Sequence, residues 1–123
     1  MRLSRLHQAA LKASDLDLSI AFYRDILNLR LVARFDPPGL AFFEVGGTRL
    51  MLSPTSNEST LYFGVDDLDA AVAELKARRV TFIQEPALVH RDDAGLFGRT
   101  GEEEWMAFFR DPGGNLLGLA TRR

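Results

Sequence analysis

Ser14-Asp15-Leu16-Asp17 opens the stretch that decides the fold, because Asp15-Leu16-Asp17 recurs 52 positions later as Asp67-Leu68-Asp69. Apolar side chains follow both copies at spacings 0, 4 and 7, which is the pattern of a helix with one buried face. Ser14 and Asp66 each stand three residues before an acid, so we expect each to cap the helix that follows. The repeated unit is therefore a strand, a cap and a helix.

Length and composition limit the classes of protein to which the chain can belong. With 123 residues, 46% of them hydrophobic, it is expected to fold as a single domain with a substantial core. The net charge of −2 and the lack of a basic stripe argue against nucleic acid as a partner. No apolar run approaches the ~20 residues needed to span a bilayer, so we expect a cytoplasmic protein without membrane contact. The absence of cysteine excludes disulfides and thiolate chemistry.

The remaining segments predict three strands after each helix. In the first half, strands are expected over 29–35, 40–45 and 48–53 after a first strand over 5–13. In the second half, they are expected over 80–90, 105–110 and 115–121 after a first strand over 60–65, with a long polar loop over 91–104. The sequence thus predicts an α+β fold made of two tandem βαβββ modules, 1–53 and 60–123, joined by a linker over 54–59.

Gly46-Gly47 indicates a two-residue hairpin turn between two of these strands. If Val45 pairs with Thr48, then Glu44 lies opposite Arg49 and Phe42 lies opposite Met51. These last four side chains share the face that points away from the helices. Glu44 and Arg49 could contact a polar ligand, or they could form a cross-strand ion pair that only fixes the register.

The duplicated Asp-Leu-Asp motif, together with Phe109-Arg110-Asp111-Pro112-Gly113-Gly114-Asn115, resembles the vicinal oxygen chelate superfamily. That family includes glyoxalase I, bleomycin-resistance proteins, methylmalonyl-CoA epimerase and extradiol dioxygenases. The resemblance covers essentially the whole chain. It implies that the two modules form an open, barrel-like cup and that the protein is a homodimer.

In metal-using members of that family, four ligands come from the cup-facing side of four strands. The resemblance places those positions on Gln8, Met51, Thr60 and Gly118. Of these, only Gln8 is a plausible ligand, because a thioether is soft and glycine has no side chain. We therefore expect no metal and no cofactor, and the sequence assigns no catalytic residue.

Aromatic and apolar side chains on the faces away from the helices indicate a site for a small organic molecule. The side chains expected to contact it are Gln8, Phe42, Glu44, Arg49, Met51, Thr60, Tyr62 and Trp105. This hypothesis is a sequestering protein of the bleomycin-resistance type that binds a hydrophobic or aromatic compound. The same side chains could instead pack against each other or against a second subunit.

Two other functions stay open. One is a metal-dependent lyase or isomerase of the lactoylglutathione-lyase type, with one divalent metal on His7, Gln8, Glu44 and His90. The other is a structural or regulatory dimer without a ligand. In the preferred register, His7 lies on the helix side without a metal, and the acidic run Glu102-Glu103-Glu104 is a solvated loop margin.

Overall fold

The structure is a computed structural model that describes residues 1–55, 57–112 and 114–123. The described residues group into two compact units, which we call the first unit, Gln8–Thr60, and the second unit, Met1–His7 with Leu61–Arg123. The predicted modules, 1–53 and 60–123, differ from these units chiefly in where residues 1–7 belong. The predicted linker includes Ser56 and the predicted final turn includes Gly113, and these two residues lie outside the described residues.

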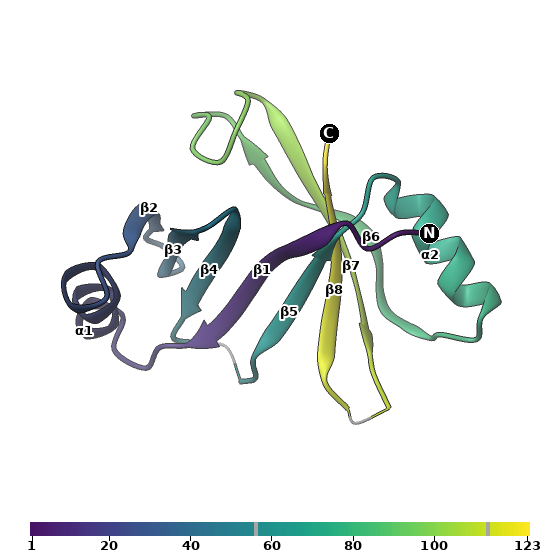
Figure 1. Cartoon of the computed structure of the whole chain (residues 1–123), viewed down its shortest axis with the longest axis horizontal. Helices are drawn as coiled ribbons and strands as arrows, with labels where there is room; N and C mark the ends of the chain where they lie inside the picture. Colours follow the sequence, from purple (N-terminus) through teal and green to yellow (C-terminus); the bar gives the residue numbers. More distant parts are fainter. Residues whose placement is uncertain (56, 113) are drawn as a thin grey trace. The chain divides into compact units, whose positions relative to one another are not determined.

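Both units contain the helix and strands that the repeat predicts (Figure 1). In chain order, the elements are β1 (Arg5–Lys12), α1 (Leu16–Ala21), the π-helix η1 (Phe22–Ile26), β2 (Arg30–Phe35), β3 (Leu40–Val45), β4 (Thr48–Ser53), β5 (Thr60–Gly64), α2 (Leu68–Ala77), β6 (Phe82–Asp92), β7 (Glu102–Arg110) and β8 (Leu116–Arg122). No helix in the described part of the chain is long and apolar enough to cross a membrane.

The same strand order occurs in each unit. The first unit has the order β2-β3-β4-β1, in which β1 and β4 are parallel and the other pairs are antiparallel. The second unit has the order β6-β7-β8-β5, in which β5 and β8 are parallel. The predicted α+β fold of two βαβββ modules is confirmed.

Each helix covers one face of its own sheet through equivalent side chains. In the first unit, the core around α1 is formed by Leu11, Ala13, Leu16, Ile20, Tyr23, Leu29, Leu31, Ala41, Phe43, Leu50 and Leu52. In the second unit, the core around α2 is formed by Phe63, Val65, Leu68, Ala71, Val72, Leu75, Phe82, Trp105, Ala107, Phe109 and Leu119. Ile20 and Val72 are related by the 52-residue repeat, so the duplicated motif marks the buried face of each helix.

The helix caps lie one residue later than the sequence indicated. Asp15 Oδ1 accepts a hydrogen bond from the amide of Leu18, and Asp67 Oδ1 accepts one from the amide of Ala70, both at 3.0 Å. Asp15 and Asp67 are therefore the N-caps, and the prediction of Ser14 and Asp66 was wrong. Two adjacent polar residues before each helix made the position ambiguous, since either can cap.

Replacing Asp67 with alanine should lower the free energy of unfolding by about 1 kcal/mol, because the cap of α2 is lost. The matched variant Asp66→Ala should have a much smaller effect, since Asp66 is exposed and does not cap the helix. Chemical denaturation of both variants measures the difference. Equal losses of stability would contradict the assignment of the cap.

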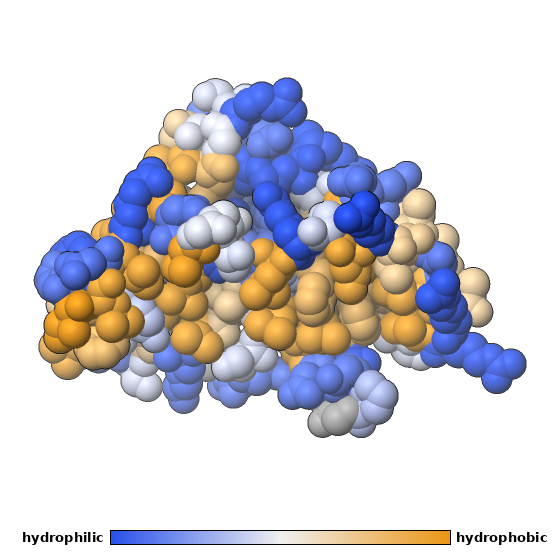
Figure 2. All heavy atoms as spheres, in the orientation of Figure 1, coloured by the Kyte–Doolittle hydropathy of each residue, from blue (hydrophilic) through white to orange (hydrophobic). Residues whose placement is uncertain are grey.

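The helix that begins at the first Asp-Leu-Asp motif divides into α1 and the π-helix η1. Asn28, with φ of 57°, follows it in a left-handed conformation that asparagine adopts more readily than most residues. Leu18, Phe22 and Ile26 stand four residues apart and remain exposed, Leu18 at 70% and Ile26 at 67%. Apolar spheres are visible in Figure 2 in the region where Figure 1 draws α1.

The strand pairs around the Gly46-Gly47 turn agree with the prediction. Glu44 pairs with Arg49, and Phe42 pairs with Met51. In the second unit, β6 and β7 are longer than expected and pair as far as Asp92 and Glu102. The predicted loop over 91–104 is therefore reduced to 93–101, and the acidic run lies within β7 rather than at a loop margin.

Candidate functional site

A polar group lies on the first unit's sheet face opposite α1. The Arg49 guanidinium donates through Nε to Oε1 of Gln8 at 2.9 Å, and Gln8 Nε2 lies 3.9 Å from Sδ of Met51. Gln8 is only 2% exposed, whereas Arg49 and Met51 are partly exposed. β1 and β4 place Gln8 beside Arg49 in register, so their side chains share this face.

Aromatic side chains adjoin this polar group. The guanidinium carbon of Arg49 lies 5.5 Å from the ring centroid of Phe42, which is within the range of a cation–π contact. The ring of Phe35 meets the ring of Phe42 edge to face, with centroids 5.8 Å apart. Glu44 accepts a hydrogen bond from the amide of Gly47 at 2.6 Å, so one of its roles is to close the hairpin turn.

Tyr62 and Gly118 are neighbours in the second unit. They pair across β5 and β8, and the ring of Tyr62 packs edge to face with Phe108 at 5.7 Å. A Cβ added at position 118 would lie 2.8 Å from Cδ2 of Tyr62 and 3.1 Å from Cε1 of Phe108. The two rings therefore occupy the space that any side chain at position 118 would need. Thr60, the first residue of β5, is buried.

Trp105 does not lie on the face where the sequence placed it. It packs with Ala107 and Phe109 in the core around α2, and its Nε1 donates to Glu103 at 2.9 Å. The guanidinium of Arg123 stacks 4.5 Å from its ring centroid. Side chains alternate along β7, and Ala107 belongs to the core around α2, so odd-numbered positions lie on the helix side. The expectation that Trp105 faces away from the helices was therefore wrong.

A buried pair of ionisable side chains was missed by the sequence reasoning. His7 Nε2 lies 2.5 Å from Oε1 of Glu104, and the two residues are 5% and 3% exposed. The prediction that Glu104 is solvated was wrong, because β7 turns it to the same side as the buried Met106. Extending the strand backwards from Met106 by two residues is the signal that would have found it.

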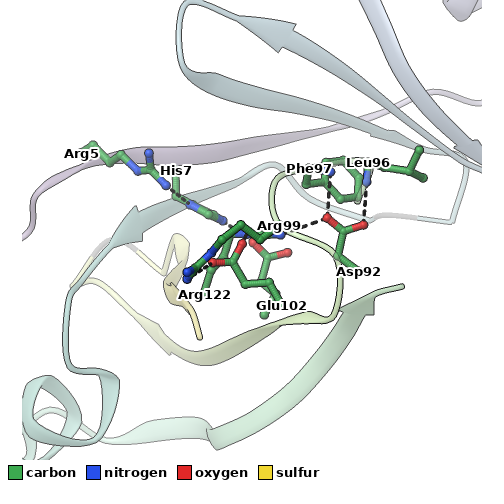
Figure 3. Close-up of polar contacts among 9 residues, drawn as sticks. Arg5, His7, Asp92, Leu96, Phe97, Arg99, Glu102 and Arg122 are labelled. Atoms are coloured by element: carbon green, nitrogen blue, oxygen red, sulfur yellow. Dashed lines mark hydrogen bonds and ion pairs between the residues drawn. The ribbon is translucent and has the colours of Figure 1, made fainter. Parts of the chain in front are cut away.

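A second group of charges lies near this pair, around Arg122. Its Nη2 donates to Asp92 at 3.1 Å, and its Nε donates to Glu102 at 2.8 Å. Asp92 also accepts bonds from the amides of Leu96 and Phe97, at 2.8 and 2.9 Å. Figure 3 shows Arg5 and His7 at one end of this set of contacts and Asp92 at the other, with Arg122 between them in the view.

These contacts shift the ionisation of the carboxylates. Burial opposes the charge on Asp92, but hydrogen bonds from Phe97, Leu96 and Arg122 outweigh it and hold the pKa of Asp92 below its ordinary value. The hydrogen bond from Arg122 is the main cause that lowers the pKa of Glu102. The loop over 93–101 is thus attached to β8 through ionised side chains.

His90 lies on β6 opposite Glu104 in register, and its ring meets that of Phe97 at 6.0 Å. Among residues 1–55, 57–112 and 114–123, no three His, Cys, Asp or Glu side chains are grouped in a way that could hold a metal ion. The grouping of side chains does not test whether the protein uses a metal, so the expected absence of a metal stays a prediction.

The chain matches a known protein family over most of its length. The family model described as Glyoxalase/Bleomycin resistance protein/Dioxygenase superfamily matches residues 5–119. The comparison with curated proteins gave no match.

Solved structures with the same fold span nearly the full chain. A superfamily member from Vibrio splendidus 12B01 has a TM-score of 0.73 at 14% identity, covering 97% of this chain and 98% of that one. A methylmalonyl-CoA epimerase from Streptomyces coelicolor, in complex with 2-nitronate-propionyl-CoA, has a TM-score of 0.71 at 21% identity, covering 98% of both chains. The Mn(II)-bound glyoxalase from Novosphingobium aromaticivorans has a TM-score of 0.72 at 20% identity, covering 97% of this chain and 39% of that one. At these identities, the likeness concerns the fold.

Proposed function

The chain belongs to the Glyoxalase/Bleomycin resistance protein/Dioxygenase superfamily, and on that premise we propose that it binds a small hydrophobic or aromatic compound without a resident metal. The observation that carries the proposal is the group formed by Gln8, Phe42, Arg49 and Met51 on one face of the first unit. Arg49 and Met51 supply a guanidinium plane and a polarisable thioether, which suit a flat organic molecule.

Gln8 and Phe42 both contact Arg49 and restrict its position. Both are buried, and each touches Arg49, so the guanidinium is held in place before any ligand arrives. A side chain fixed in this way loses less conformational entropy on binding. Glu44 belongs to the proposal as the residue that pairs with Arg49, whereas the group around Arg49 does not include Thr60, Tyr62 or Trp105.

The donor set argues for a metal-free mode of binding. The family resemblance places the four ligand positions on Gln8, Met51, Thr60 and Gly118. The amide of Gln8 is already engaged by Arg49 and Met51, and the space above Gly118 is filled by Tyr62. Because hard divalent ions require several oxygen or imidazole ligands, these residues do not fit such an ion.

The proposal also includes a cytoplasmic homodimer, as the family resemblance implies. The exposed apolar residues Leu18, Phe22 and Ile26 offer a surface for a second copy of the chain. Sedimentation velocity of the wild type and of a Leu18→Ser, Ile26→Ser variant tests this part separately.

Calorimetric titration with a panel of aromatic antibiotics and metabolites tests the binding function. For any compound that binds, Arg49→Gln should weaken the affinity about 2- to 30-fold, because the cation–π contact between the guanidinium and the aromatic ring of the ligand is lost. Lys12→Gln is the matched control, since it removes the same charge from an exposed position at the end of β1. Absence of binding across the panel, or equal losses in both variants, would contradict the proposal.

A further inference from the structure

The second unit contains a polar pocket that the proposed function does not use. Its volume is about 360 Å³, and it lies at the carboxyl ends of the parallel strands β5 and β8. Its lining includes Arg5, His7, Gly64, Asp66 and Arg122. All of these residues belong to the second unit, so the pocket is complete within it.

Contacts on both sides of the imidazole fix the orientation of His7. Nη2 of Arg5 lies 3.4 Å from Nδ1, and a guanidinium can only donate, so Nδ1 is the acceptor nitrogen. Nε2, which contacts the Glu104 carboxylate, is then the nitrogen that donates. This arrangement leaves a lone pair of Nδ1 beside Arg5, and both residues line the pocket.

Arg5 is the exposed cation of this pocket. No carboxylate among the described residues forms an ion pair with it. Arg122 pairs with Glu102 and Asp92 through Nε and Nη2, while its Nη1 is buried without a hydrogen-bond partner in the part of the chain that the structure describes. The contact between Arg5 and His7 is long for a hydrogen bond. A ligand that binds to both side chains therefore displaces only a weak interaction.

We propose that this pocket binds a small monoanionic hydroxy acid. The carboxylate pairs with the guanidinium of Arg5, and the hydroxyl donates a hydrogen bond to Nδ1 of His7. Glu104 is a positioning residue, because it holds the imidazole in the tautomer that accepts on Nδ1. Asp66 lies exposed on the lining and disfavours a second negative charge, which is why the ligand is a monoanion.

The burial of the pair supports a role in binding rather than in stability alone. Taking a histidine and a carboxylate out of water is costly, and an apolar pair of similar volume is often no less stable. Here the pair adjoins a cavity and an unpaired guanidinium, which together supply one acceptor and one cation.

Nitrogen NMR of the ¹⁵N-labelled full chain, titrated with glycolate, tests the proposal. The chain has two histidines, so His90 serves as an internal reference. Without glycolate, His7 should show the Nε2-protonated tautomer, and glycolate should shift its Nδ1 signal saturably while His90 stays unchanged. Arg5→Gln should weaken this binding about tenfold or more, and the matched exposed variant Arg78→Gln should leave it unchanged.

Two isosteres and two variants separate the individual contacts. Glycolamide, which lacks the charge, and acetate, which lacks the hydroxyl, should each bind more weakly than glycolate. Glu104→Gln keeps an acceptor and should keep the tautomer, whereas Glu104→Leu should give a mixture of tautomers and weaker binding. No shift of His7 with glycolate in the wild type, or equal affinity for acetate or glycolamide, would overturn the proposal whether or not the Leu variant folds.

Discussion

Replacing Glu104 with alanine is expected to lower the free energy of unfolding by about 1–3 kcal/mol, a large effect for a single polar side chain. The reason is that Nε2–H of the buried His7 would lose its acceptor, and a buried donor without a partner carries its full desolvation penalty. Urea denaturation followed by circular dichroism measures the change.

The control for this variant is Glu85→Ala, which removes an exposed carboxylate that pairs with Lys76. An exposed pair is expected to contribute less than about 1 kcal/mol. A double-mutant cycle with His7→Ala should also show a coupling energy between His7 and Glu104, because the residues are in contact. If Glu104→Ala costs no more than Glu85→Ala, the buried pair is not a significant interaction.

Replacing Gly118 with alanine is expected to destabilise the protein by about 1–3 kcal/mol, as overpacking does in a well-packed interior. The added methyl group would lie 2.8 Å from the Tyr62 ring and 3.1 Å from Phe108, and neither ring is the flexible end of a side chain. Thermal or urea unfolding of the variant measures the loss of stability.

Tyr62→Ala provides the matching test for Gly118. Once the ring is removed, the methyl group at position 118 should cost little, so the two substitutions should be less harmful together than their separate effects imply. Simple additivity of the two losses would show that Tyr62 does not occupy the space above Gly118. That result would also remove one argument against a ligand at this position.

The sequence predicted the features that repeat and those that local chemistry determines. The 52-residue repeat predicted both helices and their buried faces, because the spacing of the apolar residues was enough to identify Ile20 and Val72 as buried. The Gly46-Gly47 turn predicted the register that pairs Phe42 with Met51. Both inferences depend only on residues that are near in sequence or related by the repeat.

The missed features depend on where strands begin and on pairs that are distant in sequence. Placing the start of β7 at Trp105 concealed the alternation that runs from Glu102, so Trp105 was assigned to the wrong face and Glu104 to solvent. The partner of Glu104 is His7, 97 residues away, and no local pattern relates the two. The π-helical turn η1 could not be predicted either, because the apolar residues there are spaced as in an ordinary α-helix.

The two proposed sites make different demands on the chain. The face around Arg49 is proposed to hold an apolar ring, whereas the pocket at His7 is proposed to hold a small anion. Arg49→Gln should therefore leave the glycolate response of His7 unchanged, and Arg5→Gln should leave binding of aromatic compounds unchanged. The failure of either proposal is thus distinguishable from that of the other.

The central claim is that the positions at which the family holds a metal have become unsuitable for one. Its most direct test is the metal content of the purified chain, measured by mass spectrometry after exposure to excess Mn²⁺, Ni²⁺, Zn²⁺ or Fe²⁺ followed by dialysis. We predict retention far below stoichiometric for all four ions. Stoichiometric retention of any of them would contradict the claim and would favour a metal-dependent lyase or isomerase.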